Sequence, residues 1–273
     1  MKLNLGLKAS SDLTQIQDRL AYRPDVFEFF TSENDFSQEG LKNLAQAIKL
    51  VKQTTPNIVL HHPMRFGEYF TELVAPATQF PKLYHFIEKS SHDLLQLAFD
   101  YDIQVLIHGS YSRQTQTFID LYPDFETARA VVFKRILKFQ ELGQTHIMFE
   151  NSISNLFYYG DPQEEADILA THCRLAFDTS HCFIKCAGDN AKLLASLKNL
   201  QKNIVHYHLV DSLGKTHDSL PLGKGKIDWP AVLPLLNPQA TSIYEINLAN
   251  QNDALEQIQS HQYLTSLLKR KEY

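Results

Sequence analysis

Short stretches rich in β-forming residues alternate with longer amphipathic stretches, and this alternation limits the fold more than any other feature of the chain. Eight stretches predict β-strands because Val, Ile, Leu, Phe or Tyr dominate them, at residues 3–7, 26–30, 58–62, 103–108, 146–150, 175–178, 204–208 and 242–246. Strands that alternate with helices indicate a parallel sheet with helical crossovers. Eight strands suit a closed barrel better than an open sheet, so the predicted class is α/β, a single (β/α)8 TIM barrel.

Helical periodicity fills most of the gaps between these strands. Residues 38–52, 83–99, 125–142 and 253–268 each repeat apolar residues along one helix face. Gly143 is expected at a helix C-cap, and Asp228 is expected as an N-cap ahead of Pro230. The 273 residues match the length of about 250 that is typical of such a barrel. No linker or repeat interrupts them, so we expect one domain over residues 1–273.

Composition and charge narrow the function classes. A formal net charge of -5 disfavours a dedicated nucleic-acid binder, although a local basic patch is compatible with an acidic total. No apolar run approaches the about 18 residues of a membrane span, and the N-terminus does not resemble a signal peptide, so we expect a cytoplasmic protein. The three cysteines predict no disulfide framework, and Cys182 and Cys186 lack a second pair that would complete a structural zinc site.

Ionisable side chains stand at or near the C-terminal ends of six successive predicted strands. They are His62, His108, Glu150, Asp178, His208 and Glu245, with His181 just beyond the strand that ends at Asp178. In a parallel barrel these strand ends form one rim, where active sites lie. A histidine at one strand end is more often structural, but six strands with the same pattern indicate a shared site.

The alternation of side chains along a strand links these residues to their neighbours. If His62 points into the barrel, so does Leu60. His206 shares a face with His208 and lies one layer deeper. It either orients a ligand residue or is a hydrogen-bonded core histidine.

Carboxylates and imidazoles that converge on one rim are costly to bury together without a cation. These donors include no thiolate, which suits Zn, Mn, Fe or Co, so we predict a divalent-metal site. Three further acidic residues, Asp25, Glu28 and Asp102, are expected to be solvated or to contact a helix, and Glu28 is also a candidate for substrate contact.

Five short motifs resemble the xylose-isomerase-like TIM barrels, a superfamily that includes sugar isomerases and epimerases, some sugar-acid dehydratases and the DNA-repair enzyme endonuclease IV. The motifs are Phe149-Glu150-Asn151, Phe177-Asp178-Thr179-Ser180-His181, His208-Leu209-Val210-Asp211, Leu222-Gly223-Lys224-Gly225-Lys226-Ile227-Asp228-Trp229 and Tyr244-Glu245. Each motif is weak alone, and the resemblance rests on their order along the chain.

The resemblance implies a metal site made of Glu150, Asp178, His208 and Glu245. It also implies that Glu150 and Glu245 serve as an acid/base pair, as the matching glutamates do in the sugar epimerases. His181 matches a residue beside the metal or the substrate.

Endonuclease IV carries two further ligands on strands three and four, and His62 and His108 occupy those positions, so either one ion or two ions bridged by Glu150 would be bound. The chain departs from the family after strand seven, where His217 and Ser219 replace the usual Asp-x-His pair. Endonuclease IV binds a third metal at that pair, so the departure disfavours DNA repair. His217 remains a candidate for contact with substrate or metal.

The activity implied is isomerisation or epimerisation of a small sugar or sugar derivative, in which a base removes a proton next to a carbonyl. Basic residues on rim loops are candidates to hold an anionic group of the substrate: Arg65, Lys215, Lys224 and Lys226.

Two alternatives remain open. The first is an endonuclease IV-type phosphodiesterase acting on abasic DNA, in which Arg65, Phe66, Tyr69 and Phe70 would form a wedge. The same segment is also explained by a loop that caps a small pocket. The second is a metal-bearing barrel that binds a ligand without catalysis. A homo-oligomer is compatible with the sequence.

Overall fold

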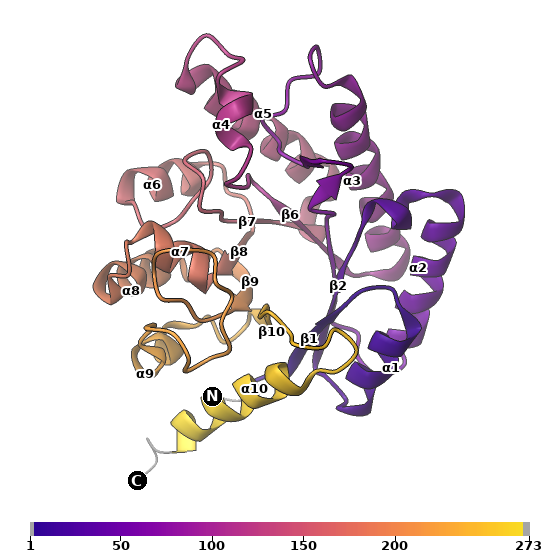
Figure 1. Ribbon diagram of the computed structural model, residues 1–273, viewed down its shortest axis with the longest axis vertical. Helices are drawn as coiled ribbons and strands as arrows, with labels where there is room; N and C mark the ends of the chain where they lie inside the picture. The colour runs from indigo at the N-terminus through magenta and orange to yellow at the C-terminus, as the bar shows by residue number, and fades with distance from the viewer. Residues whose placement is uncertain (1–2, 270–273) are drawn as a thin grey trace.

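The computed structural model describes residues 3–269. Within them, one sheet of eight parallel strands runs in the order β1-β2-β3-β6-β7-β8-β9-β10, and β1 lies against β10, so the sheet is a nearly closed barrel (Figure 1). The strands are β1 (Gly6–Ala9), β2 (Val26–Phe30), β3 (Ile58–His61), β6 (Gln104–His108), β7 (Ile147–Glu150), β8 (Leu175–Asp178), β9 (Ile204–Leu209) and β10 (Thr241–Tyr244). The predicted α/β TIM-barrel fold is confirmed.

Helices lie between the strands along the chain (Figure 1). They are α1 (Leu13–Ala21), α2 (Gln38–Val51), α3 (Pro81–Tyr101), α4 (Thr115–Ile119), α5 (Phe125–Gly143), α6 (Pro162–Ala170), α7 (Thr179–Lys185), α8 (Asn190–Leu200), α9 (Trp229–Val232) and α10 (Leu255–Lys269), with short 3-10 helices η1 (Glu33–Phe36), η2 (Gln144–His146) and η3 (Leu233–Leu235). The four predicted helices correspond to α2, α3, α5 and α10. In the part of the chain that is described, no helix combines the length and the apolar character needed to cross a membrane.

Strands β3, β6 and β9 each differ from the predicted range by one residue at one end, and the differences at β1, β7 and β10 affect residues of interest. Strand β1 begins three residues later and includes Lys8, a charged residue that the apolar pattern excluded. Strand β7 begins one residue later because His146 belongs to the 3-10 turn η2. Strand β10 ends at Tyr244, so Glu245 lies just beyond its strand. The structure also contains a short antiparallel hairpin, β4 (Arg65–Phe66) and β5 (Tyr69–Phe70), that the sequence pattern did not predict.

One predicted helix cap is confirmed and one is wrong. The Asp228 side chain accepts a hydrogen bond from the backbone N–H of Ala231, as an N-cap does. Gly143 is the last residue of α5 instead of the cap, and Gln144 takes the cap position with a φ of 49°. Gly143 is explained by packing, because a Cβ there would lie 2.7 Å from the Cβ of Ile147.

A small apolar layer fills the barrel interior below the rim. Its buried members are Val59, Leu106, Met148 and Ala176, which form a cluster apart from the main core between strands and helices. Each precedes by two residues a rim residue on the same strand: His61, His108, Glu150 and Asp178. Because side chains alternate between strand faces, these four rim residues also point into the barrel.

The barrel closes where the backbones of β1 and β10 approach each other at Gly6. A Cβ at this position would overlap the carbonyl oxygen of Ser242 and crowd the Cα of Ile243. Both obstacles are backbone atoms, so they cannot rotate away as a side chain could. Glycine is therefore required for this closure.

We predict that Gly6→Ala lowers the free energy of unfolding by more than about 4 kcal/mol or prevents folding, because overpacking against backbone is among the most costly core changes. Gly67→Ala is the control. Gly67 has a φ of 57° but open space around it, so only backbone strain of about 1–2 kcal/mol is expected. Equal losses for the two variants in chemical unfolding would contradict the role of Gly6.

Candidate metal centre

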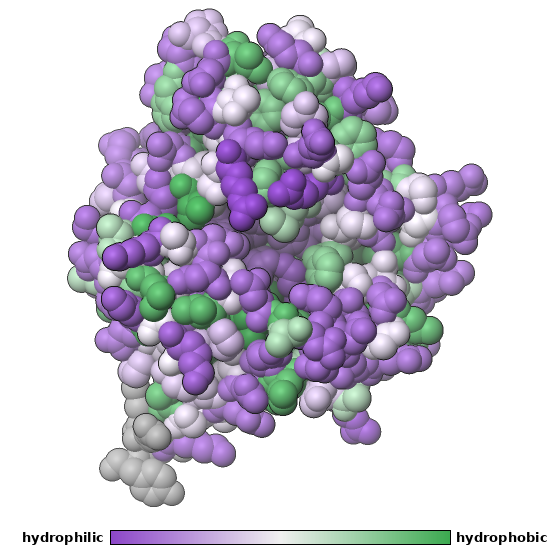
Figure 2. All heavy atoms as spheres, viewed as in Figure 1, coloured by the Kyte–Doolittle hydropathy of each residue, from purple (hydrophilic) through white to green (hydrophobic). Residues whose placement is uncertain are grey.

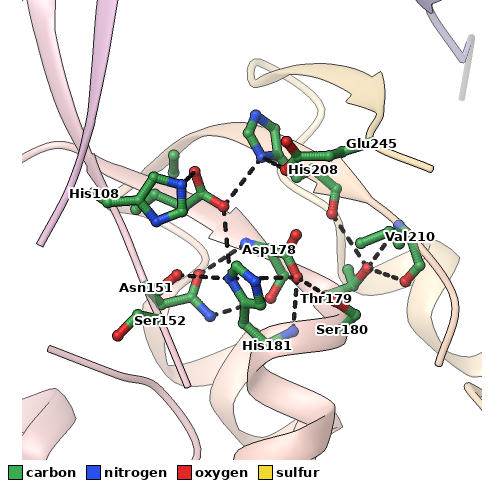
Figure 3. A network of polar contacts seen from close by, with 12 residues as sticks. His108, Asn151, Ser152, Asp178, Thr179, Ser180, His181, His208, Val210 and Glu245 are labelled. Carbon is green, nitrogen blue, oxygen red and sulfur yellow. Dashed lines mark hydrogen bonds and ion pairs between the residues drawn. The ribbon is translucent and has the colours of Figure 1, made fainter. Parts of the chain in front are cut away.

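Four residues from consecutive strands form the first group of candidate metal ligands. Glu150, Asp178, His208 and Glu245 each offer one ligand atom, and these atoms all lie within 4.8 Å of one another. The Nδ1 atom of His208 is 3.1 Å from Glu150 Oε1. The same atom contacts Glu245 Oε2, and both His208 and Glu245 are labelled in Figure 3. The first three side chains are buried, whereas Glu245 is 24% exposed and lines a cavity at the rim. A ligand in the cavity therefore reaches this group through Glu245.

A second group shares Glu150 with the first. His61, His108 and Glu150 also bring one ligand atom each within 4.8 Å. His108 Nε2 lies 3.0 Å and His61 Nε2 lies 3.6 Å from Glu150 Oε2. The two carboxylate oxygens of Glu150 thus face different groups, so the geometry accommodates one ion or two.

Unpartnered polar atoms at these groups test whether a cation fits. Glu150 Oε2, His61 Nε2 and His108 Nδ1 are buried and have no partner in hydrogen-bond geometry among the described residues, although the imidazoles of His61 and His108 lie close to Glu150 Oε2. Buried polar atoms in native proteins nearly always have partners, so this convergence needs a further species. The donors are imidazoles and carboxylates, which suit Zn, Mn, Co or Fe. The residues present therefore fit a divalent cation.

The charges in this cluster are strongly interdependent. Burial alone would raise the pKa of Glu150, but His108 and His208 hold it well below its usual range. Burial would lower the pKa of His208, but Glu150, Glu245 and Glu28 raise it well above its usual range. Burial raises the pKa of Asp178, although His181 opposes this. A cation that binds His208 Nδ1 must therefore displace a proton.

A polar layer beneath the candidate ligands holds His208 in place. Glu28 is fully buried and its Oε2 atom is 3.0 Å from His208 Nε2 and 3.1 Å from His206 Nε2. The expectation that Glu28 is solvated or contacts a helix is therefore wrong. His206 also contacts Thr241 Oγ1 at 2.6 Å, so it is a hydrogen-bonded interior histidine that orients the carboxylate partner of His208.

Lys8 is a site residue that the sequence pattern missed. It lines the cavity, forms an ion pair with Glu245, and lies 3.6 Å from Glu28 Oε1. Burial would lower the pKa of Lys8, but Glu245 and Glu28 raise it. In the sequence, Lys8 is a charged residue directly after the predicted apolar strand of residues 3–7. This position was the only sign in the sequence that Lys8 belongs to the site.

His62 does not join either group, which corrects its predicted orientation. Its side chain points toward helix α3, where Nε2 is 2.8 Å from Ser90 Oγ. Burial, with His61 and Arg135 nearby, lowers the pKa of His62 to about 3, so the ring is neutral. The adjacent His61 takes the inward position, because neighbouring residues of a strand face opposite sides.

Helix α7 begins directly at the candidate metal ligand Asp178 and places His181 beside it. Asp178 is its N-cap, and Oδ1 accepts hydrogen bonds from His181 N at 2.7 Å and Ser180 Oγ at 2.9 Å (Figure 3). His181 Nδ1 donates to the backbone carbonyl of Asn151 at 2.9 Å, and the ring stacks on His217 with centroids 4.8 Å apart. Both His181 and His217 line the cavity. The structure therefore places them beside the candidate ligands.

The cavity above the metal centre has a volume of about 930 Å³. Figure 2 shows a hollow at the centre of the barrel end, surrounded mainly by hydrophilic side chains. Of the predicted rim residues, Arg65 lines it, whereas Lys215, Lys224 and Lys226 are not among its lining residues. The predicted substrate contact of Lys224 therefore has no support in the structure. Arg113, which the sequence pattern did not single out, lines the cavity.

Comparison with known proteins identifies the family. Residues 25–265 match the model of the xylose isomerase-like TIM barrel, and the chain belongs to this family, as its motifs predicted. A search of curated proteins found no match.

Similar solved structures share the complete fold. A D-tagatose 3-epimerase-like protein has a TM-score of 0.69 at 19% identity, with 98% of this chain and 97% of that chain covered. The TTHB071 protein from Thermus thermophilus, soaked with ZnCl2, has a TM-score of 0.64 at 17% identity, with 99% of each chain covered. D-Psicose 3-epimerase from Clostridium cellulolyticum, in a structure with D-tagatose, has a TM-score of 0.67 at 12% identity, with 98% and 99% covered. These identities show a shared fold alone.

We predict that His61→Gln and His62→Gln have opposite effects. Removal of the inward imidazole of His61 should weaken metal binding at the second group by more than about tenfold. Mutation of a residue that only contacts a metal ligand already costs about tenfold or more in metal affinity, and loss of a ligand should cost more. Removal of His62 should leave metal content unchanged and lower the free energy of unfolding by about 1–3 kcal/mol, because Ser90 loses a buried partner.

Metal content after dialysis and titration calorimetry measure the first effect, and chemical unfolding measures the second. Asp178→Asn serves as the positive control, because it alters the first group. Metal loss in His62→Gln with full retention in His61→Gln would contradict the assignment.

Proposed function

We propose that this protein is a divalent-metal-dependent isomerase or epimerase that acts on a small sugar or sugar derivative by proton transfer next to a carbonyl. The observation that carries the proposal is that two carboxylates, Glu150 and Glu245, both contact His208 Nδ1. Both belong to one group of candidate ligands, and Glu245 faces the cavity. The epimerases among the similar structures support the same reaction class.

Each step assigned to this chain follows from those positions. A bound divalent cation supplies Lewis-acid stabilisation of the oxyanion that forms when the proton leaves. Glu245 takes the proton from the carbon next to the carbonyl, because it is the carboxylate with access to the cavity. For an epimerisation, Glu150 would start protonated and give that proton to the opposite face of the same carbon, while Glu245 keeps the proton that it removed. Lys8, paired with Glu245, holds the carboxylate toward the cavity floor.

The shape of the cavity supports a small substrate. Its volume of about 930 Å³ lies within the about 300–1,000 Å³ range of small-molecule sites. The hairpin β4–β5 supports the capping-loop interpretation, because Phe66 stacks on Phe86 at 4.4 Å and Phe70 is buried. Phe66 is partly buried and Phe70 is buried, so these two rings are held against the protein, whereas Tyr69 of the same hairpin is exposed.

The second ligand group keeps a phosphodiesterase as the competing function. Two neighbouring metals can stabilise both the attacking and the leaving oxygen at a phosphate, and the group of His61, His108 and Glu150 allows a second ion. A DNA substrate therefore belongs in the test.

The test incubates metal-loaded protein in D2O with ketoses, aldoses and their phosphates, and separately with a duplex that contains one abasic site. We expect metal-dependent interconversion of a sugar, with deuterium entering the carbon next to the carbonyl. Glu150→Gln and Glu245→Gln should each lower kcat by about 10²–10⁴-fold, the usual contribution of a general acid or base. Glu141→Gln, an exposed glutamate on α5, is the matched control and should retain activity.

Two results would contradict the proposal. The first is the absence of deuterium exchange with every sugar under conditions where the metal is bound. The second is metal-dependent incision of the abasic duplex that disappears in Glu150→Gln, which would favour the phosphodiesterase.

A further inference from the structure

We propose that the substrate carries an anionic group, a phosphate or a carboxylate, that binds Arg65 and Arg113 at the side of the cavity formed by the loops after β3 and β6. This inference rests on the proposed function and names the class of its substrate as an anionic sugar derivative.

The distribution of charge in the cavity is the first support. Three side chains of Lys or Arg line it: Lys8, Arg65 and Arg113. Lys8 is neutralised by Glu245 and Glu28. No ion pair links either arginine to a carboxylate among residues 3–269. Two like charges that face one cavity without a protein partner are complementary to an anionic ligand.

A further carboxylate in the cavity lining does not neutralise these arginines. Glu33 Oε2 accepts a hydrogen bond from the backbone N–H of Gly67 at 2.8 Å, at the tip of the β4–β5 hairpin. Its charge is thus directed to the hairpin backbone. Arg65 and Arg113 remain free to bind a ligand.

The position of Arg65 is fixed by a stack of rings that leads to the metal centre. Its guanidinium lies over the Phe70 ring at 4.2 Å, a cation–π contact. The Phe70 ring is 5.3 Å from Tyr111, and Tyr111 stacks on His108 at 4.5 Å. A molecule that follows this wall has one end at Arg65 and the other beside His108. The reacting carbonyl and the anionic group thus bind at opposite ends.

The loop that carries Arg113 is held by a buried carboxylate. Glu72 is fully buried and accepts hydrogen bonds from Thr115 Oγ1 at 2.7 Å, Tyr111 N at 3.0 Å and Ser110 Oγ at 3.1 Å. These bonds fix the backbone on both sides of Arg113.

One side chain joins this loop to the hairpin that carries Arg65. Gln114 Oε1 accepts from Phe70 N at 2.7 Å, and its Nε2 donates to the Glu68 carbonyl at 3.1 Å. The two arginines therefore stand on connected and ordered segments, which lowers the entropic cost of binding a ligand between them.

Other parts of the cavity lining have a different character. The segments after β1, β2 and β10 contribute neutral polar side chains and the carboxylates of Glu33 and Glu245; the neutral ones include Ser10, Gln15, Thr31, Asn247 and Gln251. These groups suit sugar hydroxyls and provide no positive charge for an anion. The cavity therefore has one cationic wall, which assigns the anionic end of the substrate to Arg65 and Arg113.

Binding of three non-reacting ligands tests this site without turnover. Titration calorimetry on metal-loaded protein compares xylitol with xylitol 5-phosphate and xylonate. We expect at least one of the two anions to bind more than about tenfold more tightly than xylitol, the effect of one charge-assisted hydrogen bond. Arg65→Gln and Arg113→Gln should each reduce this preference by about tenfold. Lys224→Gln, the same charge change outside the cavity lining, should leave the preference unchanged.

The comparison of xylitol 5-phosphate with xylonate shows whether the site binds a phosphate or a carboxylate. The site binds the anion whose tighter binding relative to xylitol is lost in the arginine variants. Equal binding of all three ligands would overturn the proposal. It would also be overturned by a preference that survives in both arginine variants and disappears in Asp178→Asn, since the anion would then bind the metal.

Failure of this proposal is distinguishable from failure of the proposed function. An arginine-dependent preference without conversion of any sugar would leave the anion site intact and remove the isomerase assignment. The opposite result is conversion of neutral sugars with the same kcat/KM as their phosphates, unchanged in both arginine variants. It would support the isomerase function and contradict the anion site.

Discussion

The buried carboxylate of Glu150 is the group on which the rest of the site depends. Three imidazoles approach it from three strands, through His61, His108 and His208, and two groups of candidate ligands include it. A buried carboxylate is stable only when positive charge and hydrogen bonds compensate its lost hydration. An apolar layer lies below it, so the compensation comes from the imidazoles, and the residues present fit a cation that would add to it. The imidazoles that stabilise the buried Glu150 carboxylate are thus also members of the candidate metal-ligand groups.

Much of this arrangement could be predicted because strand ends are conspicuous in the sequence. The apolar runs before Glu150 and Asp178 end on acidic residues, and both strands end where expected. The orientation of His61 and His62 could not be predicted in the same way. A parallel barrel strand is apolar on both faces, so no alternation showed which histidine points inward. An error of one residue reverses the face, and the structure assigns the site to His61.

The residues whose roles the sequence did not reveal lie where local patterns carry no information. Lys8 and Glu28 are charged residues within strands, and their roles depend on partners that the barrel brings close from far along the chain. Arg113 and Glu72 lie in loops, whose conformation follows from hydrogen bonds between separate segments. No local pattern in the sequence could show which side of the cavity these loops form.

The contact between β1 and β10 has a consequence for how the site is assembled during folding. Lys8 and Glu245 are 237 positions apart in the sequence, and they meet only across the seam where the barrel closes at Gly6. Contacts of such high contact order form late, because a long loop must first be ordered. During synthesis, a chain that lacks β10 has neither the closing strand nor Glu245, and the ionisable residues of its interior have no complete set of partners. The first group of candidate metal ligands, which includes Glu245, is therefore completed only when the barrel closes.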